Sequence, residues 1–547
     1  MQRIVIYMAN YIFLSILILL MLSVMGITEL RQRILFRKSI QSHLKHKHIF
    51  DDLERPYAFY DTYYQMYPSL TKKAKNESFW IDDKTWSDLN MDALFHKMNY
   101  TYTSIGENHL YHVLRLQTTL KQFDIWSQVE KNATLHEKIV TLLAQFGKQH
   151  YPKYHWKAFV TRFHWIYYFL SFLPILSVLI GFIHIPTSIF AFLFSLILNM
   201  VISMRFNHVI DRNMENLFFT GRVIYTVNAL TKLNLSLPFH YSLNQLNRVN
   251  RWRFLLVKVT TIPGYFVLLF KYIFLIDIHL YHLLVRRFKE NEETIHACYR
   301  YIGELDTLLS VKQWRYHHEN CQTPIVKSNL KFKGLTHPLI EQAVPNDFDF
   351  TQNVLLTGSN ASGKSTFMKA IALNLILAQA VQTVTAQQFH YQPGIVKTTM
   401  ANADDVLSGD SYFMAEIKSL RRLLNFDASI PHYFFIDEIF KGTNTAERIA
   451  ASQAVLEYLA QFQGIKVIAA THDIELTRQL HPIYANYHFN ETIQQNAIHF
   501  DYTIKKGPAN TRNALELIRI MDFPLTIYQN AKQHVESFDH KNTDALY

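Results

Sequence analysis

The feature that most constrains this chain is a stretch of 42 residues, 163–204, that contains no Asp, Glu, Lys or Arg. His184 and Pro186 divide it near its middle, which predicts two helices joined by a tight turn. Each half approaches the roughly 20 apolar residues that a helix needs to cross a bilayer. Neither half carries the polar stripe at helical period that two buried helices of a soluble core have. We therefore predict a transmembrane hairpin.

Two further apolar stretches bear on the membrane assignment. Residues 4–28 are uncharged and no small-residue cleavage pattern follows them, which predicts an uncleaved transmembrane anchor rather than a signal peptide. Residues 254–285 are interrupted by Lys258, Lys271 and Asp277, which predicts a buried or interfacial helix. The chain is therefore expected to be a multi-pass membrane protein that contacts lipid through three hydrophobic spans.

Basic residues flank the predicted spans and indicate their orientation. They are Arg31, Arg33, Arg37 and Lys38 after the first span, and Lys153, Lys157, Arg162, Arg205 and Arg212 around the hairpin. Everything after the first span, apart from the hairpin turn, is therefore expected to be cytoplasmic. A further basic helical face, with Arg248, Arg251 and Arg253, favours acidic lipid over nucleic acid because it follows the hairpin closely.

Composition adds limits but no function. A length of 547 residues predicts at least three modules. The net charge of +11 suits nucleotide, nucleic acid or acidic lipid and does not choose among them. The only cysteines, Cys298 and Cys321, lie far from metal-ligand spacing, so neither a disulfide scaffold nor a structural zinc site is expected.

A phosphate-binding loop is the most specific local signal. The run GSNASGKST, residues 358–366, follows an apolar strand pattern and precedes a helical pattern. Lys364 is expected to reach the terminal phosphates of ATP, and the Ser365 hydroxyl to bind Mg²⁺. The predicted ATP-binding residues are Gly358, Ser359, Asn360, Ala361, Ser362, Gly363, Lys364, Ser365 and Thr366.

Two downstream strands complete the predicted site. The buried strand pattern 432–436 ends in Asp437 and Glu438, which looks like a Walker B strand. Asp437 is expected to hold Mg²⁺ through water, and Glu438 to act as the general base toward the attacking water. A second apolar strand, 466–470, leads to His472, which is expected to sense the terminal phosphate. The candidate catalytic residues are thus Glu438, His472 and Lys364.

Four motifs in this order resemble the ATPase domain V of the MutS family. They are GSNASGKST, DDVLSGDSYFMAE from residue 404, DEIFKGTNTAER from residue 437 and ATHDIEL from residue 470. The resemblance continues at 335–347 and 500–515, while 80–115 and 302–311 look like the family's helical core. It implies an α/β P-loop NTPase, similar to ABC ATPases with a mainly parallel sheet, preceded by a mostly α-helical core with transmembrane helices.

The resemblance also implies how such a domain works. ATP is hydrolysed with Mg²⁺ in a homodimer whose two sites are composite, and the family's macromolecular ligand is DNA, including mismatches. Ser408, Gly409 and Ser411 resemble the signature loop that acts in trans. A second segment resembles the family's loop after the Walker B strand, which couples the two sites. It consists of Gly442, Thr443, Asn444 and Thr445.

The sequence departs from the family in three places. No mismatch-recognition domain or Phe-x-Glu wedge is found before the core, and an apolar hairpin occupies the place of the DNA clamp. Ala343 stands where the family has an aromatic residue that stacks on adenine. An alternative function is therefore the ATPase motor of a membrane transport or non-DNA remodelling system. A structural protein with an inactive site is disfavoured because the phosphate, Mg²⁺ and base residues are all retained.

These signals predict five segments. Residues 1–38 form the N-terminal anchor, and 39–162 form a linker and the start of the helical core. The transmembrane hairpin occupies 163–204, and the helical core returns over 205–325. The MutS-like ATPase domain with its C-terminal helices takes up 326–547.

Overall fold

The computed structural model of the protein describes residues 34–42, 80–118, 124–148, 164–256, 262–318, 320–359, 362–400, 412–441, 443–494, 497–509 and 523–544, with a few single positions before residue 121. The chain divides into two compact units. The helical unit comprises Met1–Lys72, Asn99–Tyr111 and Lys121–Gln313, and the sheet unit comprises Lys73–Met98, His112–Leu120 and Trp314–Tyr547.

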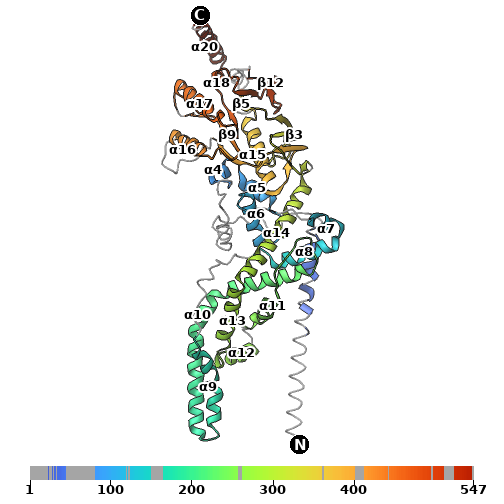
Figure 1. Ribbon diagram of the computed structural model, residues 1–547, viewed down its shortest axis with the longest axis vertical. Coiled ribbons are helices and arrows are strands. Elements are labelled where there is room, and N and C mark those ends of the chain that lie inside the picture. The colour runs from blue at the N-terminus through green and yellow to red at the C-terminus, as the bar shows by residue number, and fades with distance from the viewer. Residues whose placement is uncertain are drawn as a thin grey trace. The chain divides into compact units, whose positions relative to one another are not determined.

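The helical unit is built around one long helix, α10, which spans Ile185–Thr231 (Figure 1). Its other elements, in chain order, are α7 (Ile125–Lys131), α8 (Ala133–Phe146), α9 (Ile166–Ile180), α11 (Asn244–Asn250), the 3₁₀ helix η3 (Arg251–Leu256), α12 (Ile262–Ile273) and α13 (Ile276–Glu290). Helices α6 (Ser104–Leu114) and α14 (Glu292–His317) each contribute residues to both units. The predicted mostly α-helical region before the sheet is therefore present.

The predicted hairpin corresponds to α9 and α10, which pack side by side around a turn at 181–184 (Figure 1). Within the described part of the chain, α10 alone has both the length and the composition to cross a bilayer. Helix α9 has 15 residues, fewer than the roughly 20 that a span requires. The N-terminal stretch 4–28 lies almost entirely outside the described residues. The expectation of three spans is therefore not supported, since the structure supplies one.

The hairpin has its apolar side chains outside and its polar side chains inside. Asn199 is fully buried and donates from Nδ2 to the carbonyl oxygens of Leu170 on α9 and Ile273 on α12, both at 2.8 Å. Ser171 forms a 2.7 Å hydrogen bond with His279 of α13. In the most apolar 18-residue stretch of α10, only 11% of the residues are buried. Beyond Met204, Tyr225 is the one large apolar side chain of α10 that is exposed among the described residues.

A six-stranded sheet forms the centre of the sheet unit. Its order is β14 (Lys505–Lys506), β11 (Tyr484–His488), β5 (Asn353–Thr357), β10 (Ile465–Ala470), β9 (His432–Asp437) and β8 (Ile395–Thr399). All neighbours pair in parallel except β14, which is antiparallel to β11. Strands β5, β9 and β10 are almost continuously buried, as strands covered on both faces are. Because parallel strands share one direction, their carboxyl ends meet along one edge.

Helix α15 (Lys364–Val381) follows β5 and is buried nearly all round. One side packs on β8, β9 and β10 of the six-stranded sheet. The other side meets a four-stranded sheet of order β2 (Ile325–Val326), β7 (Gln388–Tyr391), β3 (Lys331–Leu335) and β4 (Asn346–Asp349). Phe367 of α15 lies 6.2 Å from Phe332 and 6.0 Å from Phe348 between ring centroids. A helix that is apolar on every side is stable only when enclosed in this way.

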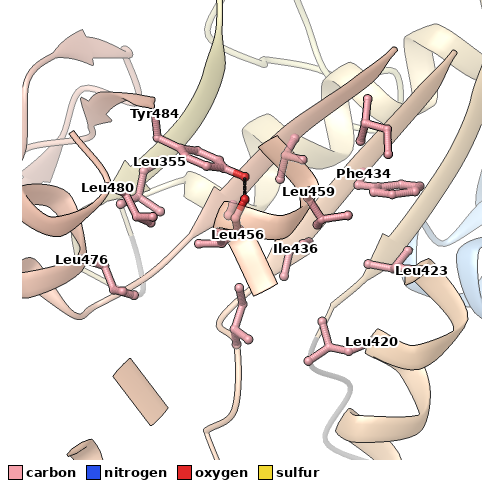
Figure 2. Close-up of a cluster of buried hydrophobic side chains, with 14 residues drawn as sticks. Leu355, Leu420, Leu423, Phe434, Ile436, Leu456, Leu459, Leu476, Leu480 and Tyr484 are labelled. Carbon is pink, nitrogen blue, oxygen red and sulfur yellow. Dashed lines mark hydrogen bonds between the residues drawn. The ribbon is translucent and has the colours of Figure 1, made fainter. Parts of the chain in front are cut away.

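The opposite face of the six-stranded sheet is covered by α16 (Tyr412–Leu424), α17 (Thr445–Ala460) and α18 (Ile474–Gln479). Figure 2 shows the cluster that joins them, in which Leu420 and Leu456 face Phe434 and Ile436 of β9. The Tyr484 hydroxyl donates to the Leu456 carbonyl oxygen at 2.9 Å, so the buried polar group of this tyrosine has a hydrogen-bond partner. This hydrophobic cluster holds β9 and β10 in place, and the residues that follow the two strands therefore have fixed positions at the sheet edge.

The remaining elements of the sheet unit are short or peripheral. They are α4 (Asp83–Asp88), α5 (Met91–Met98), the pair β1 (Cys321–Gln322) and β6 (Val384–Thr385), the pair β12 (Glu491–Gln494) and β13 (Ala497–Phe500), and α20 (Leu525–Asp544). Helix α20 begins directly after Pro524.

Candidate functional site

The predicted phosphate loop connects the end of β5 to the start of α15. Gly358 and Gly363 adopt positive φ angles of 137° and 106°, which the absence of a side chain permits. A Cβ atom on Gly358 would lie 2.7 Å from the carbonyl oxygen of Phe489, so no other residue fits there. The loop therefore turns at the two glycines that the sequence singled out, and the amino end of α15 points into it.

The Lys364 side chain folds back over this loop. Its Nζ donates to the carbonyl oxygens of Gly358 at 2.8 Å and Ser359 at 2.7 Å. Burial lowers its pKa to about 8, although the carboxylates of Asp437 and Glu491 oppose that shift. A partly desolvated ammonium group held only by neutral carbonyls gains more from an anionic ligand than a solvated lysine does.

Ser365 and Asp437 bring the first two motifs into contact. The Ser365 hydroxyl donates to Asp437 Oδ2 at 2.5 Å. Asp437 Oδ1 is buried and has no hydrogen-bond partner among the described residues. An unsatisfied buried carboxylate oxygen beside a hydroxyl provides hard oxygen ligands of the kind that Mg²⁺ prefers. These two residues therefore fit the predicted metal ion.

Glu438 and His472 meet at the ends of two adjacent strands, β9 and β10. His472 Nε2 forms a 2.9 Å hydrogen bond with Glu438 Oε1, and Lys441 pairs with Glu438 Oε2. Burial, followed by Lys364 and Lys441, lowers the pKa of His472, which favours its neutral form. Glu438 has a φ of 55°, a strained value for this residue type, and its amide donates to the Ala470 carbonyl oxygen at 3.0 Å. The carboxylate is thus held at the strand edge.

Three residues of this site escaped the sequence analysis. Lys441 pairs with Glu438, as described, and Glu491 accepts a 3.0 Å hydrogen bond from the Ser359 hydroxyl. The third, Tyr502, places its ring beside Gly363, where a Cβ atom would lie 3.1 Å from it. Lys441 and Tyr502 lie inside motifs that the sequence had already marked, whereas nothing near Glu491 signalled its role.

Tyr502 is held in position by the buried side chain of Asn346. Asn346 Nδ2 donates to the Tyr502 carbonyl oxygen at 3.0 Å, and its Oδ1 accepts from the Ile504 amide at 2.8 Å. The Tyr502 side chain remains 44% exposed. An exposed aromatic face at the end of a phosphate loop can stack on a planar base, which is relevant because Ala343 offers no ring.

The other predicted site residues are only partly placed. Ser359, Ser362 and Thr366 lie in the loop and the first turn of α15, and Ser362 is buried. Asn444 caps α17 by accepting from the Glu447 amide at 3.0 Å, and Thr443 donates to Glu447 at 3.0 Å. Thr445 begins α17. Asn360, Ala361, Ser408, Gly409, Ser411 and Gly442 lie outside the described residues.

These observations define the class of protein. It carries a mixed α/β domain whose charged site lies at the carboxyl ends of parallel strands, where a glycine loop meets a helix amino end. In this class the strands bring together side chains that are more than 70 positions apart, as with Ser365 and Asp437.

Comparison with known proteins finds similarity in the sheet-containing part of the chain. Residues 354–539 match the family model MutS domain V. The chain is 29% identical to a DNA mismatch repair protein MutS of Natronomonas pharaonis over 252 residues, which cover 44% of this chain and 29% of that protein. It is 30% identical to a MutS of Oceanobacillus iheyensis over 264 residues, covering 46% and 30%. Residues 354–539 are therefore similar to the MutS domain V.

The match is partial in length. A MutS 2 of Halobacterium salinarum is 28% identical over 261 residues, again 46% of this chain and 30% of that protein. The chain thus matches about a third of the length of these curated relatives.

Proposed function

We propose that this protein binds and hydrolyses ATP with Mg²⁺ at the site between β5, β9 and β10. The observation that carries the proposal is the contact of Ser365 with Asp437, whose second carboxylate oxygen is buried and has no hydrogen-bond partner among the residues that the structure describes. A Mg²⁺ ion held there would neutralise charge on the phosphates. Lys364 binds the terminal phosphates, exchanging its carbonyl partners for phosphate oxygens.

Glu438 and His472 carry the proton chemistry in this proposal. The Glu438 carboxylate accepts a proton from the attacking water, and neutral His472 keeps that carboxylate oriented through its 2.9 Å hydrogen bond. Lys441 pairs with the same carboxylate. The Lys441 ammonium group therefore has to move away from Glu438 before Glu438 can act as a base. Tyr502 supplies the base contact that Ala343 lacks.

The test is the steady-state ATPase rate of the full chain in a neutral detergent. Lys364→Ala should abolish both nucleotide binding and turnover, because it removes the cation that contacts the phosphates. Lys369→Ala, on the same helix but outside the loop, is the matched control and should retain turnover. Equal activity of the two variants would show that hydrolysis occurs elsewhere.

We further propose that α10, together with α9, tethers the protein to a membrane. Support comes from the large exposed apolar side chains between Trp165 and Met204 and from the buried polar contacts of Asn199. A spin label at Phe190 in a lipid nanodisc should be accessible to oxygen and protected from a polar nickel reagent. The control is a label at Glu215, further along α10, for which the opposite pattern is expected. If the labels at Phe190 and Glu215 were both accessible to the nickel reagent, the proposed membrane tether would be ruled out.

Composite sites in a dimer are proposed on family grounds, with Ser408, Gly409 and Ser411 acting in trans. Mixing a Lys364→Ala subunit with a Ser408→Ala subunit should restore turnover, because one of the two sites in the mixed dimer is then intact. Two inactive variants that stay inactive when mixed would exclude this arrangement.

DNA is the proposed macromolecular ligand because the curated relatives are named mismatch repair proteins. Duplex DNA should then stimulate ATP turnover, and added salt should weaken the stimulation because phosphate contacts release counterions. Comparing matched with mismatched duplexes tests recognition of the mismatch itself. Turnover that no DNA alters would favour the alternative, a non-DNA remodelling or transport motor.

A further inference from the structure

The helical unit contains a pocket whose lining includes none of the residues of the candidate ATPase site. It occupies about 530 Å³ between α10, α11 and η3, a volume within the usual range for small-molecule sites. Its lining residues are Tyr225, Asn228, Lys232, Asn247, Asn250, Arg251, Arg253 and Phe254. The lining therefore combines three cationic side chains and three amides with two aromatic rings, and it contains no carboxylate.

The pocket carries positive charge from its three cationic side chains. No carboxylate among the described residues pairs with Lys232, Arg251 or Arg253. Burial and the neighbouring guanidinium of Arg222 both lower the pKa of Arg253, so two like charges lie close together in a partly desolvated position. Such an arrangement is unfavourable by itself and becomes favourable when an anion binds between the charges.

The pocket is also rigidly constructed. Asn250 is 5% exposed, and its Nδ2 donates to the Gly221 carbonyl oxygen of α10 at 2.7 Å. Its Oδ1 accepts from Arg253 Nη1 at 2.6 Å, which fixes the guanidinium. A Cβ atom on Gly221 would lie 2.4 Å from Asn250 Oδ1 and 2.7 Å from Arg253 Cδ, so the glycine permits this close approach. The arginine is therefore positioned before any ligand arrives.

We propose that this pocket binds a phosphate-bearing anion. A planar guanidinium can donate two parallel hydrogen bonds to phosphate oxygens, and Lys232 adds a point charge at the rim. Tyr225 and Phe254, 60% and 62% exposed, offer apolar surface to the rest of the ligand. The phosphate can belong to a soluble ester or to a lipid headgroup.

Position along α10 favours a soluble phosphate ester. Tyr225 lies 21 residues beyond Met204, where the exposed apolar surface ends. At about 1.5 Å per residue this corresponds to roughly 30 Å along the helix. A headgroup next to the apolar segment would have to bridge that distance to enter the pocket.

The experiment titrates inorganic phosphate and glycerol 3-phosphate into the full chain in neutral detergent, at constant ionic strength. A Lys364→Ala background removes the affinity of the ATPase site. Saturable binding is expected, and Arg253→Gln should weaken it roughly tenfold or more, because a charge-assisted hydrogen bond is lost. Lys232→Gln should also weaken binding and, because this side chain is exposed, it leaves the fold intact. The matched control is Arg248→Gln, an exposed arginine of α11 outside the lining.

A second arm distinguishes the two sources of phosphate. Binding to phosphatidylcholine vesicles is compared with and without phosphatidic acid. Extra binding that requires Arg253 and Lys232 but not Arg248 identifies a headgroup ligand, whereas a response confined to the soluble esters identifies a free one. No binding in either arm, or an equal loss in the Arg248 control, would overturn the proposal.

Discussion

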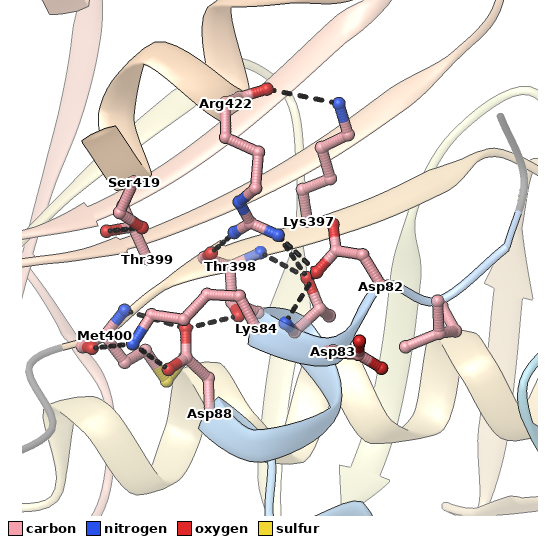
Figure 3. A network of polar contacts seen from close by, with 12 residues as sticks. Asp82, Asp83, Lys84, Asp88, Lys397, Thr398, Thr399, Met400, Ser419 and Arg422 are labelled. Atoms are coloured by element: carbon pink, nitrogen blue, oxygen red, sulfur yellow. Dashed lines mark hydrogen bonds and ion pairs between the residues drawn. The ribbon is translucent and has the colours of Figure 1, made fainter. Parts of the chain in front are cut away.

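The guanidinium of Arg422 on α16 donates a hydrogen bond to the carboxylate of Asp82, the residue that caps α4, although 340 positions separate them (Figure 3). Arg422 also reaches the Thr398 carbonyl oxygen, and Lys397 Nζ donates to the Arg422 carbonyl oxygen at 3.3 Å. Fully buried Asp88 accepts from Thr398 Oγ1 at 2.8 Å and from the Met400 amide at 3.1 Å. The network joins α4 to the edge strand β8 and to α16.

Replacing Arg422 should therefore destabilise the sheet unit. Arg422→Met leaves the half-buried Asp82 carboxylate without its cation, and we expect a loss of about 2 kcal/mol. Its neighbour Arg421 is exposed, so Arg421→Met should stay within about 0.5 kcal/mol of the wild type. Thermal unfolding of the full chain measures both, and similar melting temperatures for the two variants would contradict a stabilising role for the network.

Glu438→Gln should separate ATP binding from hydrolysis. The amide keeps the size of the side chain but cannot accept a proton, so turnover should fall by about 100-fold or more while nucleotide binding persists. Binding is measured with a fluorescent nucleotide, and turnover by phosphate release. Glu457→Gln on α17 makes the same chemical change away from the site and should leave both quantities unaltered. If Glu438→Gln released phosphate as fast as the wild type, Glu438 would not be the general base.

Asp437→Asn should raise the Mg²⁺ concentration needed for turnover. The change removes the negative charge from the carboxylate that contacts Ser365. A hard dication binds neutral oxygen more weakly, so half-maximal activation should move upward by about tenfold or more. A Mg²⁺ titration of turnover is the measurement, with the exposed Asp427→Asn as control. An unchanged activation curve would place the metal elsewhere.

ATP affinity should decline as the pH rises above about 8. In the protein without nucleotide, Lys364 has a pKa of about 8 instead of 10.5, so it loses its proton through this range. Phosphate binding requires the protonated form, and binding above this pH is therefore coupled to uptake of one proton. The dissociation constant should rise by up to tenfold for each pH unit from about 8. Isothermal titration across pH tests this, and Lys364→Arg should bind with little pH dependence.

Ionisation of the buried Asp306 carboxyl should make the helical unit less stable at neutral pH than at acidic pH. It is fully buried and accepts from the amides of Tyr102 and Thr103, and burial raises its pKa from 3.8 to about 6. A carboxyl with a raised pKa keeps its proton longer in the folded state, so its stabilising contribution is complete below about pH 3.8 and is lost between 3.8 and 6. The loss amounts to about 3 kcal/mol.

Hydrogen exchange of residues 99–111, compared at about pH 4.5 and about pH 7 and corrected for intrinsic rates, measures the larger part of this loss. Asp306→Asn cannot ionise, so its protection should be lower overall but independent of pH across this range. Protection in the wild type that increases with pH would contradict the assignment.

Much of the candidate site could be predicted from local sequence. Glycines at 358 and 363 are needed wherever a loop must turn at positive φ, and an apolar strand that ends in Asp437 and Glu438 places carboxylates at a sheet edge. Glu491 could not be found this way. It belongs to a short peripheral strand, and only folding brings its carboxylate to the Ser359 hydroxyl.

The sequence by itself determined the elements whose cause is local. The uncharged run 163–204 specified apolar helices. The four ordered motifs between residues 358 and 476 indicated the α/β domain through their resemblance to a known family. Helix length was not determined in this way, because α10 continues to Thr231 through a segment that carries exposed charged residues and packs on α8, α11 and η3.

Only the tertiary structure decided which distant side chains meet. Strand order places β10 between β5 and β9, so His472 lies beside Glu438, 34 positions away. The Asp82 to Arg422 hydrogen bond and the pocket around Arg253 likewise join residues from separate elements. The physical reason is that hydrophobic periodicity fixes the buried face of each element, whereas the choice of neighbours depends on how all those faces pack together.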